Sequence, residues 1–140
     1  MKGNVRMQEL RRHRMKELGI IAVYLFGSEA EGTMTTRSDI DIGVVLEEPE
    51  DLEDTRPLYN ALYAELSRVY KPTFLRDLDI VLLQKAPLTL QYNAITHGKI
   101  LYEEDPVQRA DYEESVTNSY LDFRPVLEYF NGIASRRYTR

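Results

Sequence analysis

Two aspartates, Asp39 and Asp41, interrupt a run of branched apolar residues soon after a Gly27-Ser28 pair. In a β-strand successive side chains alternate between faces, so these carboxylates would share one face, about 7 Å apart along the strand. Aspartate is a poor strand former, which makes its recurrence here informative. Asp79 repeats the pattern at the start of another apolar run, "IVLL". If the two strands are neighbours, the three carboxylates can converge.

A cluster of like charges repels itself unless a cation lies among its members. Carboxylate oxygens with room for water and phosphate oxygens suit Mg²⁺, with Mn²⁺ as a substitute. The candidate ligands and catalytic residues are Asp39, Asp41 and Asp79. Asp77 has the same parity as Asp79 and is the alternative third ligand. Asp79 is favoured because it lies deeper in the apolar run.

The Gly27-Ser28 pair ends an apolar run of strand length. Together with the carboxylates it forms a candidate nucleotide site, in which the carboxylates would hold the cation and this turn would bind phosphate. Gly27 allows a sharp turn and the close approach of a phosphate to the backbone. Backbone N–H groups and the Ser28 hydroxyl can bind an anion there. The alternative for Ser28 is to cap the next helix. Ser38 is a further candidate for contact with the nucleotide.

The elements that must position these residues follow from hydrophobic periodicity and from glycine and proline. The pattern predicts strands over residues 20–26, 38–46, 77–83 and 99–104, the last as an edge strand, and helices over 4–18, 55–70, 88–97 and 106–123. Pro125 should kink or restart the last helix, and residues 135–140 should form a frayed tail. This order predicts an α/β (α+β) fold, a small mixed β-sheet flanked by helices. Pattern alone leaves open whether the strands pair parallel or antiparallel.

Composition predicts a single domain over residues 1–140, with a core at about 20–105 and a C-terminal helical segment at about 106–136. The net charge of −5 argues against stable binding to nucleic acid. No apolar run is long enough for a membrane span. The absence of cysteine suits a reducing cytoplasm.

The resemblance to a known family rests on spacing. Gly27-Ser28, ten residues and then Asp39-Ile40-Asp41 reproduce the GSX10DXD signature of the DNA polymerase β-like nucleotidyltransferase superfamily. With Asp79 and the small size, the chain resembles a minimal nucleotidyltransferase (MNT) domain protein over roughly residues 20–105. The resemblance implies a polymerase β-like fold and two metal ions held by the Asp39-Asp41 pair. It also implies that Asp79 completes the site and assists the attacking hydroxyl, and that the Gly27-Ser28 turn holds the triphosphate of ATP.

Many stand-alone MNT proteins are antitoxins paired with a HEPN-domain toxin, a ribonuclease, and transfer AMP from ATP to a tyrosine of that toxin. The resemblance therefore implies an antitoxin adenylyltransferase in a hetero-oligomer with its toxin. Two alternatives stay open: a non-catalytic antitoxin that masks the toxin by contact, and transfer to a small molecule such as an aminoglycoside.

Two features bear on these alternatives. The family usually has a basic residue after Gly-Ser, whereas this chain has Glu29 and Glu31, which would weaken triphosphate binding unless they point away. The C-terminal helix is rich in aromatic residues, and it either covers the core or binds a partner.

Overall fold

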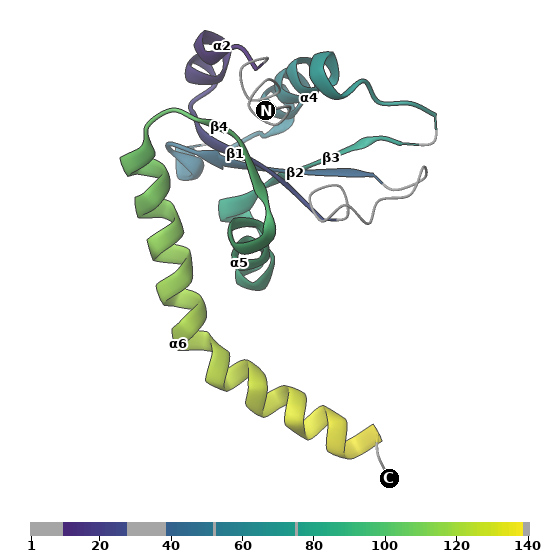
Figure 1. The fold of residues 1–140 in the computed structure, drawn as a ribbon, viewed down its shortest axis with the longest axis vertical. Helices are drawn as coiled ribbons and strands as arrows, with labels where there is room; N and C mark the ends of the chain where they lie inside the picture. The colour runs from purple at the N-terminus through teal and green to yellow at the C-terminus, as the bar shows by residue number, and fades with distance from the viewer. Residues whose placement is uncertain (1–9, 28–38, 52, 75, 139–140) are drawn as a thin grey trace.

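The computed structural model describes residues 10–27, 39–51, 53–74 and 76–138 (Figure 1). The elements in chain order are α2 Arg12–Glu17, β1 Ile20–Phe26, β2 Ile40–Leu46, η1 Pro49–Asp51, α4 Arg56–Tyr70, β3 Leu78–Leu82, η2 Leu83–Lys85, α5 Leu88–His97, β4 Lys99–Glu103 and α6 Pro106–Tyr138. The predicted order of helices and strands is confirmed, and the fold is a mixed α+β fold. Residues 4–9 of the first predicted helix lie outside the described residues.

The four strands form one sheet in the order β3-β2-β1-β4. β1 pairs antiparallel with β2 and with β4, whereas β2 and β3 pair parallel. The parallel pairing requires the chain to cross from the end of β2 back to the start of β3, and α4 makes that crossing. The structure thus answers the question that the pattern left open: the sheet is mixed, and β4 lies at an edge as predicted.

Both faces of the sheet are covered by an apolar cluster, and β2 contributes residues to each. One cluster joins the β2 residues Ile40, Ile42, Val44 and Leu46 to Met15, Leu58, Leu62 and Leu66 of α2 and α4. The other cluster lies on the α5 side and contains Tyr24, Val45, Leu83 and Ala94. Figure 1 shows α2 and α4 on one side of the sheet and α5 on the other.

One buried carboxylate lies within α4. Glu65 is 2% exposed. It accepts hydrogen bonds from the backbone N–H of Arg11 (2.8 Å), the Arg11 guanidinium (2.9 Å) and the Arg68 guanidinium (3.1 Å). Burial alone would raise the pKa of Glu65, but the hydrogen bonds from Arg68 and Arg11 outweigh burial and lower it to about 2. Glu65 therefore remains charged and ties the start of α2 to α4.

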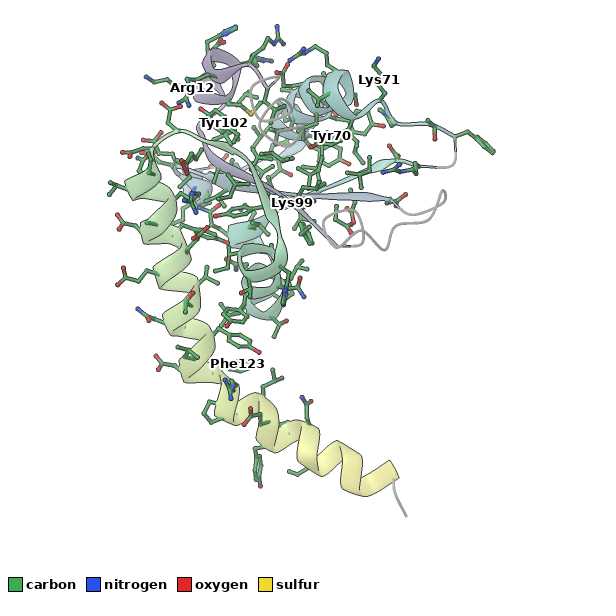
Figure 2. All side chains as sticks on the ribbon, viewed as in Figure 1. Arg12, Tyr70, Lys71, Lys99, Tyr102 and Phe123 are labelled. Carbon is green, nitrogen blue, oxygen red and sulfur yellow. The ribbon has the colours of Figure 1, made fainter. Side chains whose placement is uncertain are left out.

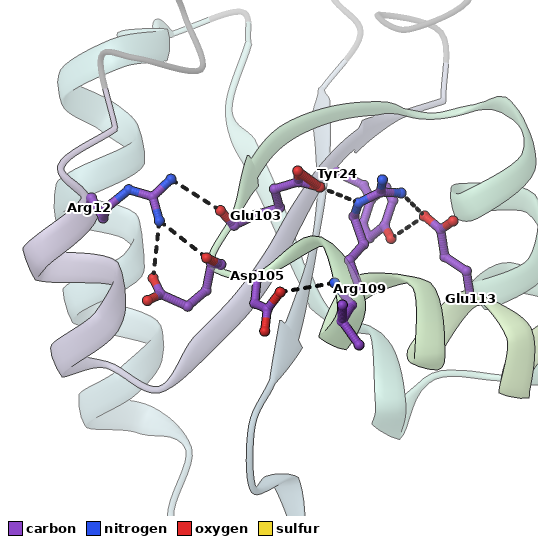
Figure 3. A network of polar contacts seen from close by, with 8 residues as sticks. Arg12, Tyr24, Glu103, Asp105, Arg109 and Glu113 are labelled. Atoms are coloured by element: carbon purple, nitrogen blue, oxygen red, sulfur yellow. Dashed lines mark hydrogen bonds and ion pairs between the residues drawn. The ribbon is translucent and has the colours of Figure 1, made fainter.

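The first turns of α6 are fixed to the sheet by the polar network in Figure 3. The Arg109 guanidinium binds Glu103 of β4 (2.5 Å) and Glu113 of α6 (2.8 Å), and the Tyr24 hydroxyl of β1 donates to Glu113 (2.6 Å). Further along, the rings of Tyr92 and Tyr120 stack with centroids 3.8 Å apart, which joins α6 to α5.

The second half of α6 is helical, as the predicted C-terminal segment to about residue 136 requires. The helix was expected to run to about Phe123 and then to kink or restart at Pro125; α6 continues through Pro125 to Tyr138 as one helix, so residues 135–138, which were expected in a frayed tail, are helical. Figure 1 shows the helix changing direction along its length, and Phe123 lies close to the bend in Figure 2. A kink at Pro125 was one of the two predicted outcomes. Proline removes a helix hydrogen bond without necessarily ending the helix, so the helix can continue past it with a bend.

Several large apolar side chains of this second half are exposed: Leu121, Phe123, Val126, Tyr129 and Phe130. α6 has 33 residues. Within the described part of the chain, however, neither α6 nor any other helix combines the length and the hydropathy of a membrane span.

Candidate active site

Three adjacent strands bring predicted site residues to one edge of the sheet. Gly27 directly follows β1, Asp41 is the second residue of β2, and Asp79 is the second residue of β3. Because β1 runs antiparallel to β2, its end lies beside the start of β2, where Phe26 pairs with Asp41. Because β3 runs parallel to β2, its start lies at the same edge.

Asp41 and Asp79 are direct partners in the parallel ladder. Their backbones are therefore about 4.8 Å apart, and both side chains leave the same face of the sheet. The pKa of Asp41 is raised to about 6, first by burial, then by the negative charge of Asp79, by a hydrogen bond between the two carboxyl groups and by the charge of Asp39. The structure thus brings two carboxylates into direct interaction, with a third close enough to influence them.

Asp39 lies just before β2 and its side chain is exposed. Its Oδ1 accepts a hydrogen bond from the backbone N–H of Asp77 (3.3 Å). The carbonyl of Asp77 in turn accepts the N–H of Ile40 (2.9 Å), which closes the start of the β2–β3 ladder. Asp39 is therefore held at the site edge by the backbone of the neighbouring strand.

Asp77 and Asp79 have different surroundings, although the sequence gives them equal parity. Asp77 precedes β3, and its carboxylate accepts hydrogen bonds from the hydroxyl of Tyr63 on α4 (2.5 Å) and from the N–H of Leu78 (2.8 Å). The Tyr63 hydrogen bond is the main cause that lowers the pKa of Asp77. Parity applies only within a strand, so the residue before β3 can turn toward α4. The structure pairs Asp79, and not Asp77, with Asp41.

Gly27 lies against the carboxylate of Asp41. Its φ of +74° is in the left-handed region that favours glycine. A Cβ at this position would lie 2.2 Å from Asp41 Oδ2 and 3.1 Å from its Cγ. The absence of a side chain therefore lets the end of β1 approach the carboxylate pair.

Two of the predicted nucleotide-binding residues cannot be placed. Ser28 and Ser38 lie outside the described residues, as do Glu29 and Glu31. Their predicted roles stay predictions.

The carboxylates fit a divalent cation by their chemistry. No group of three or more acidic or histidine side chains converges on one point among the described residues. Mg²⁺ does not require such a cage, since it is usually bound by one or two carboxylates together with water and substrate phosphates. In the described part of the chain no basic side chain forms an ion pair with Asp41 or Asp79. Uncompensated oxygen ligands of this kind suit Mg²⁺.

Sequence reasoning missed Tyr63. Tyr63 and Tyr70 both pack against the α4-side core cluster, and the Tyr63 hydroxyl also reaches the carboxylate of Asp77. The signal for Tyr63 was weak, because its partner Asp77 lies after the end of α4 and is identified only when the β2–β3 pairing is known.

Two cavities of about 250 and 240 Å³ lie at the other end of β1 and β2. Gly19 lines both, with Leu58 in the first and Gln108 in the second. Neither cavity contains a predicted site residue, so neither is part of the carboxylate site.

Comparisons with known proteins agree with this geometry. The family model described as "Polymerase beta, Nucleotidyltransferase" matches residues 8–107. The comparison with curated proteins gives no match. A crystal structure of a toxin–antitoxin with AMP-PNP is similar to the chain with a TM-score of 0.66 and 22% identity, over 90% of this chain and 99% of the other.

Two further solved structures are similar. One is a tri-AMPylated Shewanella oneidensis HEPN toxin in complex with MNT antitoxin, with a TM-score of 0.65 and 19% identity over 95% of this chain and 98% of the other. The other is the toxin–antitoxin MntA-HepT, with a TM-score of 0.61 and 18% identity over 98% of this chain and 99% of the other. At these identities the likeness is one of fold.

Proposed function

The chain belongs to the polymerase beta nucleotidyltransferase family, and on that premise we propose that it transfers AMP from ATP to a tyrosine of a cognate HEPN-domain ribonuclease toxin and thereby neutralises the toxin. The observation that carries this proposal is the in-register pair of Asp41 and Asp79 beside Gly27. An antitoxin needs no such pair to bind a partner, whereas two adjacent like charges are suited to hold a cation.

The solved relatives suggest which acceptor to test. One of them is an MNT antitoxin in complex with a HEPN toxin that carries three AMP groups, and another is a toxin–antitoxin with an ATP analogue. By analogy, the acceptor proposed for this chain is a tyrosine hydroxyl of a HEPN-domain partner, in a hetero-oligomer of the two proteins.

The reaction is a substitution at the α-phosphorus of ATP. The tyrosine oxygen forms a bond to this phosphorus while the bond to the oxygen bridging the α- and β-phosphates breaks, so that pyrophosphate leaves. The proton of the tyrosine hydroxyl must be accepted at the site, and Asp79, at the exposed end of the carboxylate pair, is the candidate acceptor. The main contribution of such a site is to position the reactants and to balance their charge.

Mg²⁺ is the cofactor we propose, as two ions held by Asp39, Asp41 and Asp79. When bound, Mg²⁺ would balance the charge of the triphosphate and favour ionisation of the attacking hydroxyl. Asp41 is influenced by the charges of both Asp79 and Asp39 and would hold the cation together with them. Gly27 would let the triphosphate approach the backbone, with Ser28 and Ser38 as further nucleotide contacts. A cytoplasmic setting is proposed, since ATP is available there and the chain has no cysteine.

A second function, masking of the toxin by contact alone, is favoured by the exposed apolar residues of α6, including Phe123, Tyr129 and Phe130. Exposed aromatic residues of this kind are common at protein interfaces. Masking and catalysis can operate in one antitoxin, so the two must be separated by experiment.

The test is to incubate the protein with ATP, Mg²⁺ and the HEPN-domain protein encoded next to it, and to measure intact masses. We expect the partner to gain mass in steps of one adenylate and to lose ribonuclease activity in parallel. Asp41→Asn is the control, because it should still bind the partner but leave its mass unchanged. If Asp41→Asn suppresses the ribonuclease as well as the wild type does, masking is the function.

A further inference from the structure

A chain of contacts links α4 to the carboxylate of Asp39. The Tyr63 hydroxyl donates to Asp77 Oδ1 (2.5 Å), and the same oxygen accepts the N–H of Leu78 (2.8 Å). The backbone of Asp77 faces β2: its carbonyl accepts the N–H of Ile40 (2.9 Å), and its N–H donates to Asp39 Oδ1 (3.3 Å). Tyr63 is thus connected to Asp39 through one residue.

The bond from Asp77 restricts a side chain that has little else to hold it. Asp39 is exposed and precedes the first residue of β2. A free carboxylate of this kind loses rotational freedom when it binds a cation. The N–H of Asp77 engages one oxygen of Asp39 beforehand and leaves Oδ2 available to a ligand. Hydrogen bonds that orient a metal ligand commonly strengthen metal binding.

The side chain of Asp77 is suited to hold its backbone in place. One of its oxygens is engaged twice, by α4 and by the strand that follows. Tyr63 thereby fixes the entry to β3 relative to α4, and the position of the Asp77 N–H follows from that entry.

We propose that Tyr63 and Asp77 are positioning residues that hold the Asp39 carboxylate in the orientation with which it binds a divalent cation. The proposal rests on the nucleotidyltransferase function proposed above, because that function requires the cation. Asp77 then acts through Asp39 and is not itself a ligand.

Cation binding can be measured without ATP or acceptor, by following the melting temperature during a titration with Mg²⁺. Tyr63→Phe removes only the hydroxyl, and we expect it to weaken the apparent affinity for Mg²⁺ about tenfold. Tyr59→Phe is the matched control. It removes the same atom one turn earlier on α4, from a ring whose centroid lies 6.3 Å from that of Tyr63. Its affinity should stay within about twofold of the wild type.

Substitutions of Asp77 extend the test. Asp77→Asn keeps an oxygen that can accept from Tyr63, so it should bind Mg²⁺ nearly as well as the wild type. Asp77→Ala removes that oxygen and should resemble Tyr63→Phe. The double variant Tyr63→Phe/Asp77→Ala should be no weaker than Asp77→Ala alone, because both changes break the same connection.

An equal Mg²⁺ response in the wild type, Tyr63→Phe and Asp77→Ala, including no response in any of them, would overturn the proposal. So would a purely structural effect, in which Tyr63→Phe lowers the melting temperature in EDTA but leaves the affinity for Mg²⁺ unchanged. The outcome is separate from the choice of acceptor. If the wild type does not modify the HEPN partner while Tyr63→Phe still weakens Mg²⁺ binding, the positioning role stands and the proposed acceptor is wrong.

Discussion

Two carboxylate sites in this fold differ in how their charge is balanced. Glu65 is almost completely buried, and the chain itself supplies two arginines, Arg11 and Arg68, to neutralise it. Asp41 is only half-buried, yet it faces Asp79 and Asp39, and no basic side chain of the described chain pairs with it. Their pKa values move in opposite directions, to about 2 for Glu65 and to about 6 for Asp41.

The difference separates a structural carboxylate from a functional one. A charge that serves only the fold has its counter-charge within the fold. A group whose charge is left unbalanced, and whose pKa is displaced by neighbours of the same sign, is a candidate ligand or catalytic residue. Four predictions test this comparison.

The largest expected effect is on activity. Asp79→Asn should reduce AMP transfer by on the order of a thousandfold, because it removes one of the paired carboxylates. Glu65→Gln should retain most of the activity at a temperature where it is folded. Glu65 lies on α4, and its polar partners in the described structure are Arg11 and Arg68, which are not site residues. Initial rates from intact mass spectrometry measure both. A similar loss of activity in both variants would contradict the assignment of Asp79 as a functional carboxylate and Glu65 as a structural one.

The same chemical change should alter stability with opposite sign at the two sites. Glu65→Gln removes a charge that two arginines stabilise and should lower the free energy of unfolding by roughly 1.5–3 kcal/mol. In EDTA, Asp41→Asn removes a repelled charge and should raise the free energy of unfolding. The rise in the pKa of Asp41 from 3.8 to about 6 corresponds to at most about 3 kcal/mol. Solvent screening of the half-exposed pair reduces this to roughly 1–2 kcal/mol. Urea unfolding of both variants in EDTA gives the two signs, and equal signs contradict the comparison.

The closeness of Gly27 to Asp41 can be tested against a second glycine. Gly27 and Gly19 both have positive φ, +74° and +72°, but a Cβ at Gly19 meets nothing within 4 Å. Gly19→Ala should therefore cost only the backbone strain, about 1–2 kcal/mol. Gly27→Ala should cost more, and it should also reduce AMP transfer and Mg²⁺ binding because the new methyl group displaces the Asp41 carboxylate. Thermal melts and AMP-transfer rates measure both effects. Equal melting temperatures and equal rates in the two variants would contradict the prediction.

The smallest effect is a pH dependence in EDTA. The raised pKa of Asp41 means that the folded protein holds this proton more tightly than the unfolded chain. The stabilisation that comes from proton binding at Asp41 is fully present below pH 3.8 and is lost as the pH rises through about 6. The wild type should thus gain stability relative to Asp41→Asn as the pH falls from 7 to 5. Glu65 acts in a lower window: its lowered pKa causes a loss of stability as the pH falls from 4.5 toward 2.

The pH series is measured as wild type minus Asp41→Asn, which cancels the groups that the two proteins share. Parallel curves between pH 7 and 5 would show that Asp41 is not strained. With Mg²⁺ present the trend should weaken or reverse, because the cation binds the ionised carboxylates and competes with protons.

The sequence predicted elements best where local signals bound them. An apolar run that ends at Gly27 gave β1 over residues 20–26, and Gly98 closes the helix predicted over 88–97, both with the bounds that the structure has. The sequence left open whether Pro125 kinks the last helix or restarts it, because a proline interrupts one hydrogen bond and can be accommodated by a bend; in the structure α6 continues through it. At the end of α4, Tyr70 is buried in the core, whereas Val69 beside it is only partly buried.

What the sequence could not give depends on pairing between distant segments. The register that places Asp79 beside Asp41 joins two strands separated by the whole of α4. The burial of Glu65 was also missed, because a glutamate in a helix is normally interpreted as exposed and its partner Arg11 lies 54 residues away. Period-two alternation gave Asp77 and Asp79 the same parity; their depth in the apolar run favoured Asp79, and the start of β3 at Leu78 explains why Asp77 can turn toward α4.

The place of β3 at the edge of the sheet affects the order in which the molecule is assembled. β1 and β2 are neighbours in sequence and can pair as soon as both have left the ribosome, whereas β3 can join only after α4 has been made. We therefore expect the nascent chain to pair β1 with β2 before Asp79 reaches Asp41. In the cation-free protein the repulsion between Asp41 and Asp79 acts across the β2–β3 pairing, through which β3 joins the described sheet. We therefore expect native-state opening to begin with the separation of β3 from β2, and a bound cation to oppose this separation.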